Sequence, residues 1–347
     1  MSLTAADGAG AAATYAFGAL WWVAFFVGMP GPEAAFGRQG SPTPAATRDS
    51  VPARVGLALQ SYTGRRGVDE ISTAPDILRP EVLALMGELG IETAGVESVE
   101  LTPAERGSYG VWQRVSLADA HLGRAVAPMA REGNFVLGLL GNCISSWGML
   151  AGLQRSGPSA APLKVGLIWI DAHGDFNTPE TTLSGWLGGM PVSVAAGQSL
   201  VRLRTTAGLD PPISTRDIVQ MGSRDVDPLE QVLIDESHIT VISPEDMVQR
   251  SDAMKRAVRR LSKRVDVIYL HVDLDILDAT AIPGSFFETP GGATASEVAA
   301  VLRELMADPK VKALGIASFP TAEEGRETSM RSTLTLIRAA LEGLRDR

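Results

Sequence analysis

The sequence predicts an α/β fold whose mainly parallel sheet is covered by helices on both faces. Short, continuous apolar runs recur along the chain, and segments with helical spacing of apolar residues lie between them. Strands without polar alternation are buried on both faces, and their alternation with helices is typical of a parallel sheet. Polar clusters follow several of the runs, at the sheet edge where ligands bind in such folds.

The predicted elements follow one another from residue 55 to residue 344. Apolar runs predict strands at 55–59, 135–140, 165–170, 217–221, 238–242, 265–272 and 312–317. Helical spacing predicts helices at 78–89, 145–153, 252–262, 295–306 and 332–344. The sequence has no internal repeat, so we expect a single domain over residues 54–347.

Composition narrows the classes of partner. The chain has 347 residues, of which 45% are hydrophobic and 20% charged, as in ordinary globular proteins. The net charge of −9 argues against a nucleic-acid partner and suits binding of cations, either metal ions or a cationic substrate. Cys143 is the single cysteine, so no intrachain disulfide can form.

Residues 1–53 are predicted to be an N-terminal extension and linker, poorly structured or containing a short apolar helix. They are rich in Ala, Gly, Pro and Ser. The uncharged run 15–29 is shorter than the roughly 20 residues of a membrane span. No Lys or Arg precedes this run, whereas Asp7 does, unlike a signal peptide. We therefore expect a cytoplasmic protein, with an exported or membrane-associated form as the alternative.

Two clusters of potential metal ligands directly follow buried strands. Asp171, His173 and Asp175 stand at alternate positions after one strand, and Asp273 and Asp275 have the same spacing after another. Alternate side chains of an extended segment point the same way, so each cluster converges on one place. Any one of these residues could instead be a helix cap or a solvated loop residue.

Four aspartates gathered in one cleft repel one another unless cations neutralise them. Carboxylates with one imidazole suit Mn²⁺ and similar ions. The two clusters together therefore predict two divalent metal ions that turn a water molecule into a nucleophile, and the ligand types favour Mn²⁺.

These motifs carry a family resemblance. Asp171-Ala-His-Gly-Asp-Phe-Asn-Thr-Pro followed by His271-Val-Asp-Leu-Asp resembles the ureohydrolase superfamily of arginases, agmatinases and formiminoglutamases. The resemblance spans about residues 55–344 and is closest to Nω-hydroxy-arginine amidinohydrolase-like members. It implies a three-layer α/β/α sandwich, a binuclear Mn²⁺ site, hydrolysis of a C–N bond in a guanidino compound, and homotrimers or hexamers.

The resemblance also implies roles for the metal ligands. Asp171 and Asp273 would bridge both metals, while His173 and Asp275 would complete one of them. Asp175 would complete the other metal and act catalytically by passing a proton to the leaving amine.

Four further residues match the substrate-binding positions of arginases. Asn177 and Ser184 would hold the α-carboxylate of an amino-acid substrate, and Asp227 and Glu230 would hold its α-amino group. The alternative for Asp227 and Glu230 is a capped loop before an exposed helix. The loop from Arg65 to Asp69 matches a segment at the mouth of the active site, or is a basic surface turn.

Four positions depart from the family pattern. Cys143 replaces the usual first histidine ligand, and we interpret it as a metal ligand because a thiolate binds metal. Gly188 replaces a proton-shuttling histidine, Ser318 lies near the position of a guanidinium-pairing glutamate, and Phe287 lies near that of a threonine.

The departures leave several functions open. A hydroxylated guanidine has a better leaving group and needs less help from a proton shuttle, which favours Nω-hydroxy-arginine. A formimino or other amidine is a second substrate class. A non-catalytic metal-binding scaffold or regulatory subunit is a further alternative.

The histidines outside the clusters are interpreted as structural. His121 and His238 lie far from the motifs in sequence. His271 is expected to face away from Asp273 and to have a structural or supporting role.

Overall fold

The computed structural model describes residues 54–286 and 289–347. The predicted extension at 1–53, with its apolar run, lies outside the described residues, as does Phe287. Among the helices that are described, none is long and apolar enough to cross a membrane.

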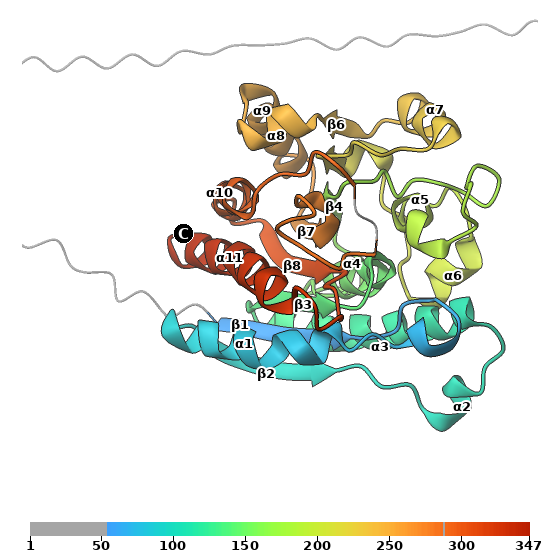
Figure 1. Ribbon diagram of the computed structural model, residues 1–347. Helices are drawn as coiled ribbons and strands as arrows, with labels where there is room; N and C mark the ends of the chain where they lie inside the picture. The colour runs from blue at the N-terminus through green and yellow to red at the C-terminus, as the bar shows by residue number, and fades with distance from the viewer. Residues whose placement is uncertain (1–53, 287–288) are drawn as a thin grey trace, which may run out of the picture. The chain divides into compact units, whose positions relative to one another are not determined.

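An eight-stranded, entirely parallel sheet forms the middle layer (Figure 1). Its order is β2-β1-β3-β8-β7-β4-β5-β6. The strands are β1 (Arg54–Gln60), β2 (Glu92–Ser98), β3 (Phe135–Leu140), β4 (Val165–Ile170), β5 (Ile218–Met221), β6 (Thr240–Ile242), β7 (Val267–Asp273) and β8 (Val311–Ala317). Every residue of β3, β4 and β7 is buried, as expected for strands covered on both faces.

Helices cover both faces of the sheet (Figure 1). One face packs against α1 (Ala74–Glu88), α8 (Pro244–Val248), α9 (Asp252–Ser262), α10 (Ala295–Met306) and α11 (Arg326–Arg345). The other packs against α3 (Val111–Arg131), α4 (Ser146–Gln154), α5 (Pro191–Ala195) and α6 (Val201–Thr206). The remaining helices are α2 (Pro103–Arg106) and α7 (Pro228–Glu236). The predicted α/β/α fold class is therefore confirmed.

Strand β2 and helix α3 are absent from the elements predicted above. β2 is an edge strand that pairs only with β1, and most of its residues are exposed. Its sequence, Glu-Thr-Ala-Gly-Val-Glu-Ser, therefore lacks the apolar run that marks the inner strands. Helix α3 buries Val115, Leu122, Val126 and Met129, whose spacing does follow a helical period.

The topology places four inner strands side by side. β3, β8, β7 and β4 are consecutive in the sheet although β8 is the last strand in sequence. Because the strands are parallel, all four end at one edge, and the segments that follow them meet there.

Candidate metal centre and substrate pocket

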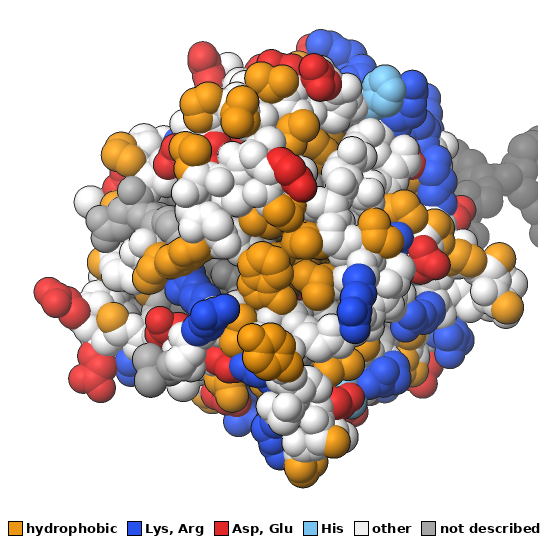
Figure 2. All heavy atoms as spheres, turned by 90° about the vertical axis from the view of Figure 1, so that its right-hand side faces the viewer, with side chains coloured by type: hydrophobic (Ala, Val, Ile, Leu, Met, Phe, Trp, Pro, Cys, Tyr) orange, Lys and Arg blue, Asp and Glu red, His pale blue; other side chains and the backbone are white. Residues whose placement is uncertain are grey.

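A pocket of about 1360 Å³ opens at this edge of the sheet. Its floor carries residues from the ends of the four inner strands: Cys143 after β3, Asp171 after β4, Asp273 at the end of β7 and Ser318 after β8. Figure 2 looks onto this side of the molecule and shows apolar side chains gathered near its middle, beside basic ones. Apolar lining residues that are exposed at the mouth are Ile71, Tyr109, Leu183, Trp186 and Phe286.

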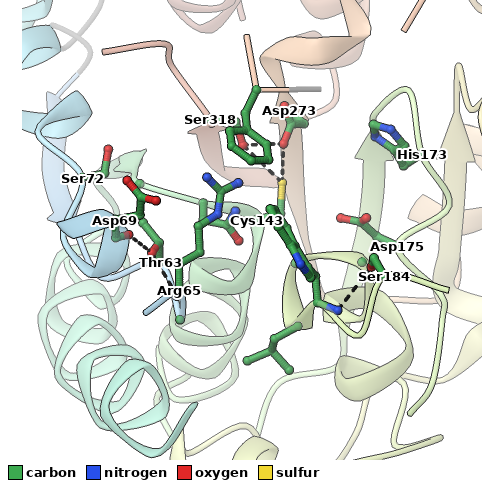
Figure 3. A pocket seen from close by; sticks show the side chains of 18 of the residues that line it. Thr63, Arg65, Asp69, Ser72, Cys143, His173, Asp175, Ser184, Asp273 and Ser318 are labelled. Atoms are coloured by element: carbon green, nitrogen blue, oxygen red, sulfur yellow. Dashed lines mark hydrogen bonds between the residues drawn. The ribbon is translucent and has the colours of Figure 1, made fainter. Parts of the chain in front are cut away.

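One group of potential ligands consists of Cys143, Asp171 and Asp273. Their ligand atoms lie within 4.8 Å of one another, and all three residues are buried. The Cys143 thiol lies 2.6 Å from Oδ2 of Asp273 and 3.9 Å from Oδ2 of Asp171 (Figure 3). Asn142 fixes the turn after β3 by accepting a hydrogen bond from the N–H of Ile144.

A second group consists of Asp171, His173 and Asp275, again with ligand atoms within 4.8 Å of one another. Nδ1 of His173 lies 3.3 Å from Oδ1 of Asp171 and 3.1 Å from Oδ2 of Asp275. Asp171 belongs to both groups, so its two oxygens are placed to serve two neighbouring sites. Asp273 lies only in the first group.

Asp175 lies in the same pocket but belongs to neither compact group. Only 6% of its surface is exposed, and no described residue donates a hydrogen bond to its carboxylate. Its backbone has a left-handed φ of 49°, and its carbonyl accepts hydrogen bonds from the N–H groups of Val192 and Ser193. The loop after β4 therefore holds a carboxylate that has no donor among the described residues and points into the pocket, toward the side where Cys143 lies (Figure 3).

Crowding and burial disturb the protonation of the cluster. Burial raises the pKa of Asp273 to about 7, and burial with the charge of Asp171 raises that of Asp275 to about 6. Burial, followed by the charge of Asp171, also raises the pKa of Asp175 well above its usual value. Burial lowers the pKa of His173, but Asp171 and Asp275 more than offset it and raise the pKa to about 12.

These residues fit a metal centre. Several carboxylates share one buried site, and their raised pKa values show that their negative charges are poorly compensated by the protein alone. Divalent cations would supply that compensation. The donors of the second group are oxygens and one imidazole nitrogen, whereas the first group adds a sulfur, which is the softer ligand.

His271 contacts Cys143 but does not itself line the pocket. Its Nε2 lies 3.2 Å from the Cys143 sulfur, and its Nδ1 lies 2.9 Å from the hydroxyl of Tyr269. The expectation that His271 faces away from Asp273 is wrong, because residues two apart in a strand point to the same side of the sheet. Of the other histidines, His121 pairs with Glu105, and His238 lies 3.0 Å from Arg216; neither lines the pocket.

Asp227 and Glu230 brace the loop that carries Asp175. Asp227 is the N-cap of α7 and forms a capping box with Glu230. Glu230 is buried, and its carboxylate accepts hydrogen bonds from the N–H groups of Phe176 and Asp227 at 2.6 and 3.2 Å. Asp227 also accepts a hydrogen bond from the Asn177 side chain at 3.0 Å. The capped loop is therefore present, but the helix start is buried at Glu230 and faces the pocket.

The remaining predicted residues lie at the pocket wall. Ser184 is exposed and accepts a hydrogen bond from the N–H of Trp186 at 3.2 Å. Gly188 lines the pocket beside Asn142. Ser318 adopts a left-handed φ of 62° and donates a hydrogen bond to Asp273 at 2.6 Å. Its hydroxyl therefore steadies a metal-ligand candidate.

Two arginines near the site were not assigned a role from sequence. Arg65 lines the pocket, so its loop is not merely a surface turn. Arg224 donates hydrogen bonds to the carbonyls of Asp275 and Thr289 at 2.9 and 3.0 Å and thereby fixes the segment after β7. The sequence shows the polar cluster around Arg224. The carbonyls that accept its hydrogen bonds lie about 50 to 65 residues further along the chain, so the sequence alone does not identify them.

The fold and the site define a class: an α/β protein with a carboxylate-rich candidate metal centre at the carboxyl edge of a parallel sheet. Residues 55–341 match the arginase family. The chain is 29% identical to the arginase of Bacillus caldovelox over 266 residues, covering 74% of this chain and 86% of that protein. It is 31% identical to the N(omega)-hydroxy-L-arginine amidinohydrolase of Streptomyces lavendulae over 223 residues, covering 63% and 74%.

A solved structure agrees with these similarities. The crystal structure of arginase from Bacillus subtilis superposes with a TM-score of 0.70 at 24% identity, covering 84% of this chain and 98% of that one. The chain belongs to the arginase family.

Proposed function

We propose that this protein is a metal-dependent amidinohydrolase that cleaves a C–N bond of a guanidino compound. The observation that carries the proposal is the pair of ligand groups that share Asp171 on the floor of the pocket. Membership of the arginase family and the names of its relatives support the same reaction class.

Cys143, Asp171 and Asp273 would hold one divalent ion, and Asp171, His173 and Asp275 a second. We propose Mn²⁺ for the oxygen- and imidazole-rich half. When bound, such ions lower the pKa of water enough to supply a nucleophile at neutral pH.

The remaining chemistry belongs to this chain's own side chains. The buried Asp175 carboxyl is placed to hold a proton and to pass it to the leaving amine. Asn177, Ser184, Asp227 and Glu230 would position the amino-acid end of the substrate, the last two partly by fixing the loop.

A hydroxylated guanidine is the favoured substrate among guanidino compounds. Gly188 offers no side chain that could carry a proton. Ser318 has a hydroxyl rather than a carboxylate to pair with the guanidinium, and this hydroxyl donates a hydrogen bond to Asp273. A leaving group that departs more readily needs less protonation. The similarity to the hydroxy-arginine amidinohydrolase supports this choice.

The test is a panel of L-arginine, Nω-hydroxy-L-arginine and agmatine with the full chain and added Mn²⁺, scored for urea and hydroxyurea. We expect hydroxyurea release to be fastest and to disappear in Asp171→Ala. Asp235→Ala removes an exposed carboxylate outside the pocket and should leave the rates unchanged.

Two bound metals without turnover of any guanidino or formimino compound would instead support a non-catalytic scaffold. The homotrimer or hexamer implied by the resemblance stays a prediction, which light scattering of the purified protein tests.

A further inference from the structure

Arg65 reaches into the pocket from the loop that follows β1. Its guanidinium carbon lies 4.1 Å from the ring centroid of Phe286 and 5.1 Å from that of Trp186. The two rings are themselves 5.1 Å apart, with an interplanar angle of 34°. A guanidinium that stacks on aromatic rings is held in a defined position without using its hydrogen-bond donors.

No described residue accepts a hydrogen bond or forms an ion pair with the Arg65 side chain. Among the described residues, the only hydrogen bond of Arg65 comes from its backbone N–H, which donates to the Thr63 hydroxyl. The guanidinium carries five N–H donors. The Arg65 guanidinium is therefore held in place in the pocket, and none of its N–H groups donates a hydrogen bond to a described residue.

Arg65 faces the acidic side of the pocket. Burial lowers the pKa of Arg65, while the charges of Asp69 and Asp273 raise it. An arginine remains charged under these conditions. In Figure 3 its side chain extends from the loop toward the side where Cys143 and Asp273 lie. Among the described lining residues, only Arg65 and its exposed neighbour Arg66 are Lys or Arg.

The pocket thus presents carboxylates on its floor and one stacked guanidinium on its wall. A ligand with a cationic group at one end and a carboxylate at the other matches both. A ligand with cations at both ends matches the floor but is repelled by Arg65.

We propose that Arg65 is a specificity-determining residue that binds the carboxylate of a guanidino acid. This inference rests on the proposed function and assigns to one residue the selection of substrates that carry a carboxylate. Guanidino amines, which lack it, should be poor substrates.

The other candidate carboxylate-binding residues cannot supply this charge. Ser184 is neutral and already accepts a hydrogen bond from the N–H of Trp186. The Asn177 side chain donates to Asp227 and accepts from Thr181. Arg65 offers two parallel N–H donors to a carboxylate, which is the strongest common form of such recognition.

Steady-state kinetics with L-arginine and agmatine, which differ only by the carboxylate, test the proposal. In Arg65→Ala of the full-length, Mn²⁺-loaded protein, we expect KM for L-arginine to rise about tenfold to a hundredfold. The KM for agmatine should stay the same or fall, and kcat should change little. Arg65→Lys keeps the positive charge but loses the two parallel N–H donors of the guanidinium. Its KM for L-arginine should lie between those of the wild type and Arg65→Ala.

Arg66→Ala is the matched control and should leave the ratio of the two KM values unchanged. An equal change for both substrates in Arg65→Ala, or an equal shift in Arg66→Ala, would overturn the role of Arg65 while leaving the hydrolase in place. Thermal melting shows whether each variant is folded.

Calorimetric binding of L-ornithine and putrescine gives a readout that does not need turnover. We expect Arg65→Ala to weaken L-ornithine binding by the factor given above for the KM of L-arginine and to leave the affinity for putrescine unchanged. If the wild type binds L-ornithine through Arg65 but hydrolyses no guanidino compound, the recognition stands and the proposed hydrolase fails. Binding of L-ornithine that is unaffected by Arg65→Ala contradicts the inference.

Discussion

The imidazole of His271 stacks on Trp169, with ring centroids 3.9 Å apart, and places Nε2 3.2 Å from the Cys143 sulfur. Burial lowers the pKa of His271 to about 3, so the ring is neutral and carries one proton. If the Tyr269 hydroxyl donates to Nδ1, the ring proton resides on Nε2 and points at the sulfur. A hydrogen bond donated to the sulfur favours its thiolate form, which is the form that binds metal.

Replacing His271 by Leu removes the Nε2 donor from the Cys143 sulfur and leaves the Tyr269 hydroxyl without its imidazole partner. We expect the affinity for Co²⁺ at the cysteine-containing group to fall about tenfold to a hundredfold, because outer partners of metal ligands have effects of that size. The free energy of unfolding should fall by about 1–3 kcal/mol. Co²⁺ titration followed by thiolate-to-metal charge-transfer absorption measures the first effect. His238→Leu is the control, and unchanged Co²⁺ affinity in His271→Leu would speak against the support role.

The sulfur of Cys143 should give the first ligand group a preference for softer ions. Cys143→Asp exchanges the thiolate for a carboxylate at the same place. After dialysis against equal concentrations of Co²⁺ and Mn²⁺, we expect the ratio of bound Co²⁺ to Mn²⁺ to fall in this variant. Cys143→Ser should lose about one metal per chain, as measured by elemental analysis. A metal content identical to that of the wild type in both variants would show that Cys143 is not a ligand.

Buried apolar strands and the residues that follow them could be predicted from sequence. Asp171, His173, Asp273 and Asp275 do meet, because parallel strands end at one edge and alternate side chains share a direction. Strand β2 could not be predicted, since an exposed edge strand needs no apolar run. The position of Arg65 beside Trp186 and Phe286 depends on three loops that are far apart in sequence, and no local pattern encodes such a contact.

Without metal, the protein should lose stability as the pH rises from about 4 to about 7. The folded-state pKa values of Asp275 and Asp273, about 6 and about 7, lie above the unfolded value of about 3.9. A carboxyl with a raised folded pKa contributes its full stability below the unfolded pKa and loses it as the pH passes the folded pKa. We expect the Tm of chelator-treated protein to fall across this window.

Mn²⁺ should remove that loss, because it compensates the ionised carboxylates. The gap in Tm between Mn²⁺-loaded and metal-free protein should therefore widen toward pH 7, as scanning calorimetry would show. Asp273→Asn should flatten the fall in the metal-free protein. A Tm of the metal-free protein that rises over the same range would refute the argument.

Glu230 should act on the reaction through the loop that carries Asp175. Glu230→Ala leaves the N–H of Phe176 without its acceptor and is expected to lower the free energy of unfolding by about 1–3 kcal/mol. We expect kcat to fall more than metal content, because Asp175 is displaced while the two metal-ligand groups stay intact. Activity assays, elemental analysis and denaturant unfolding measure these three quantities.

Gly174, which precedes Asp175, allows the contact between Glu230 and this loop to be tested on its own. A Cβ at Gly174 would lie 2.7 Å from Oε1 of Glu230, so Gly174→Ala should push the carboxylate away and destabilise the loop. In the Glu230→Ala background the added methyl group no longer meets the carboxylate and retains only the contact with Cδ1 of Ile234, at 3.0 Å, so the same substitution should cost less. A double-mutant cycle of unfolding free energies therefore yields a clear coupling between the two positions if Glu230 braces the loop. Additive effects would mean that Glu230 stabilises the protein elsewhere and that its link to Asp175 is absent.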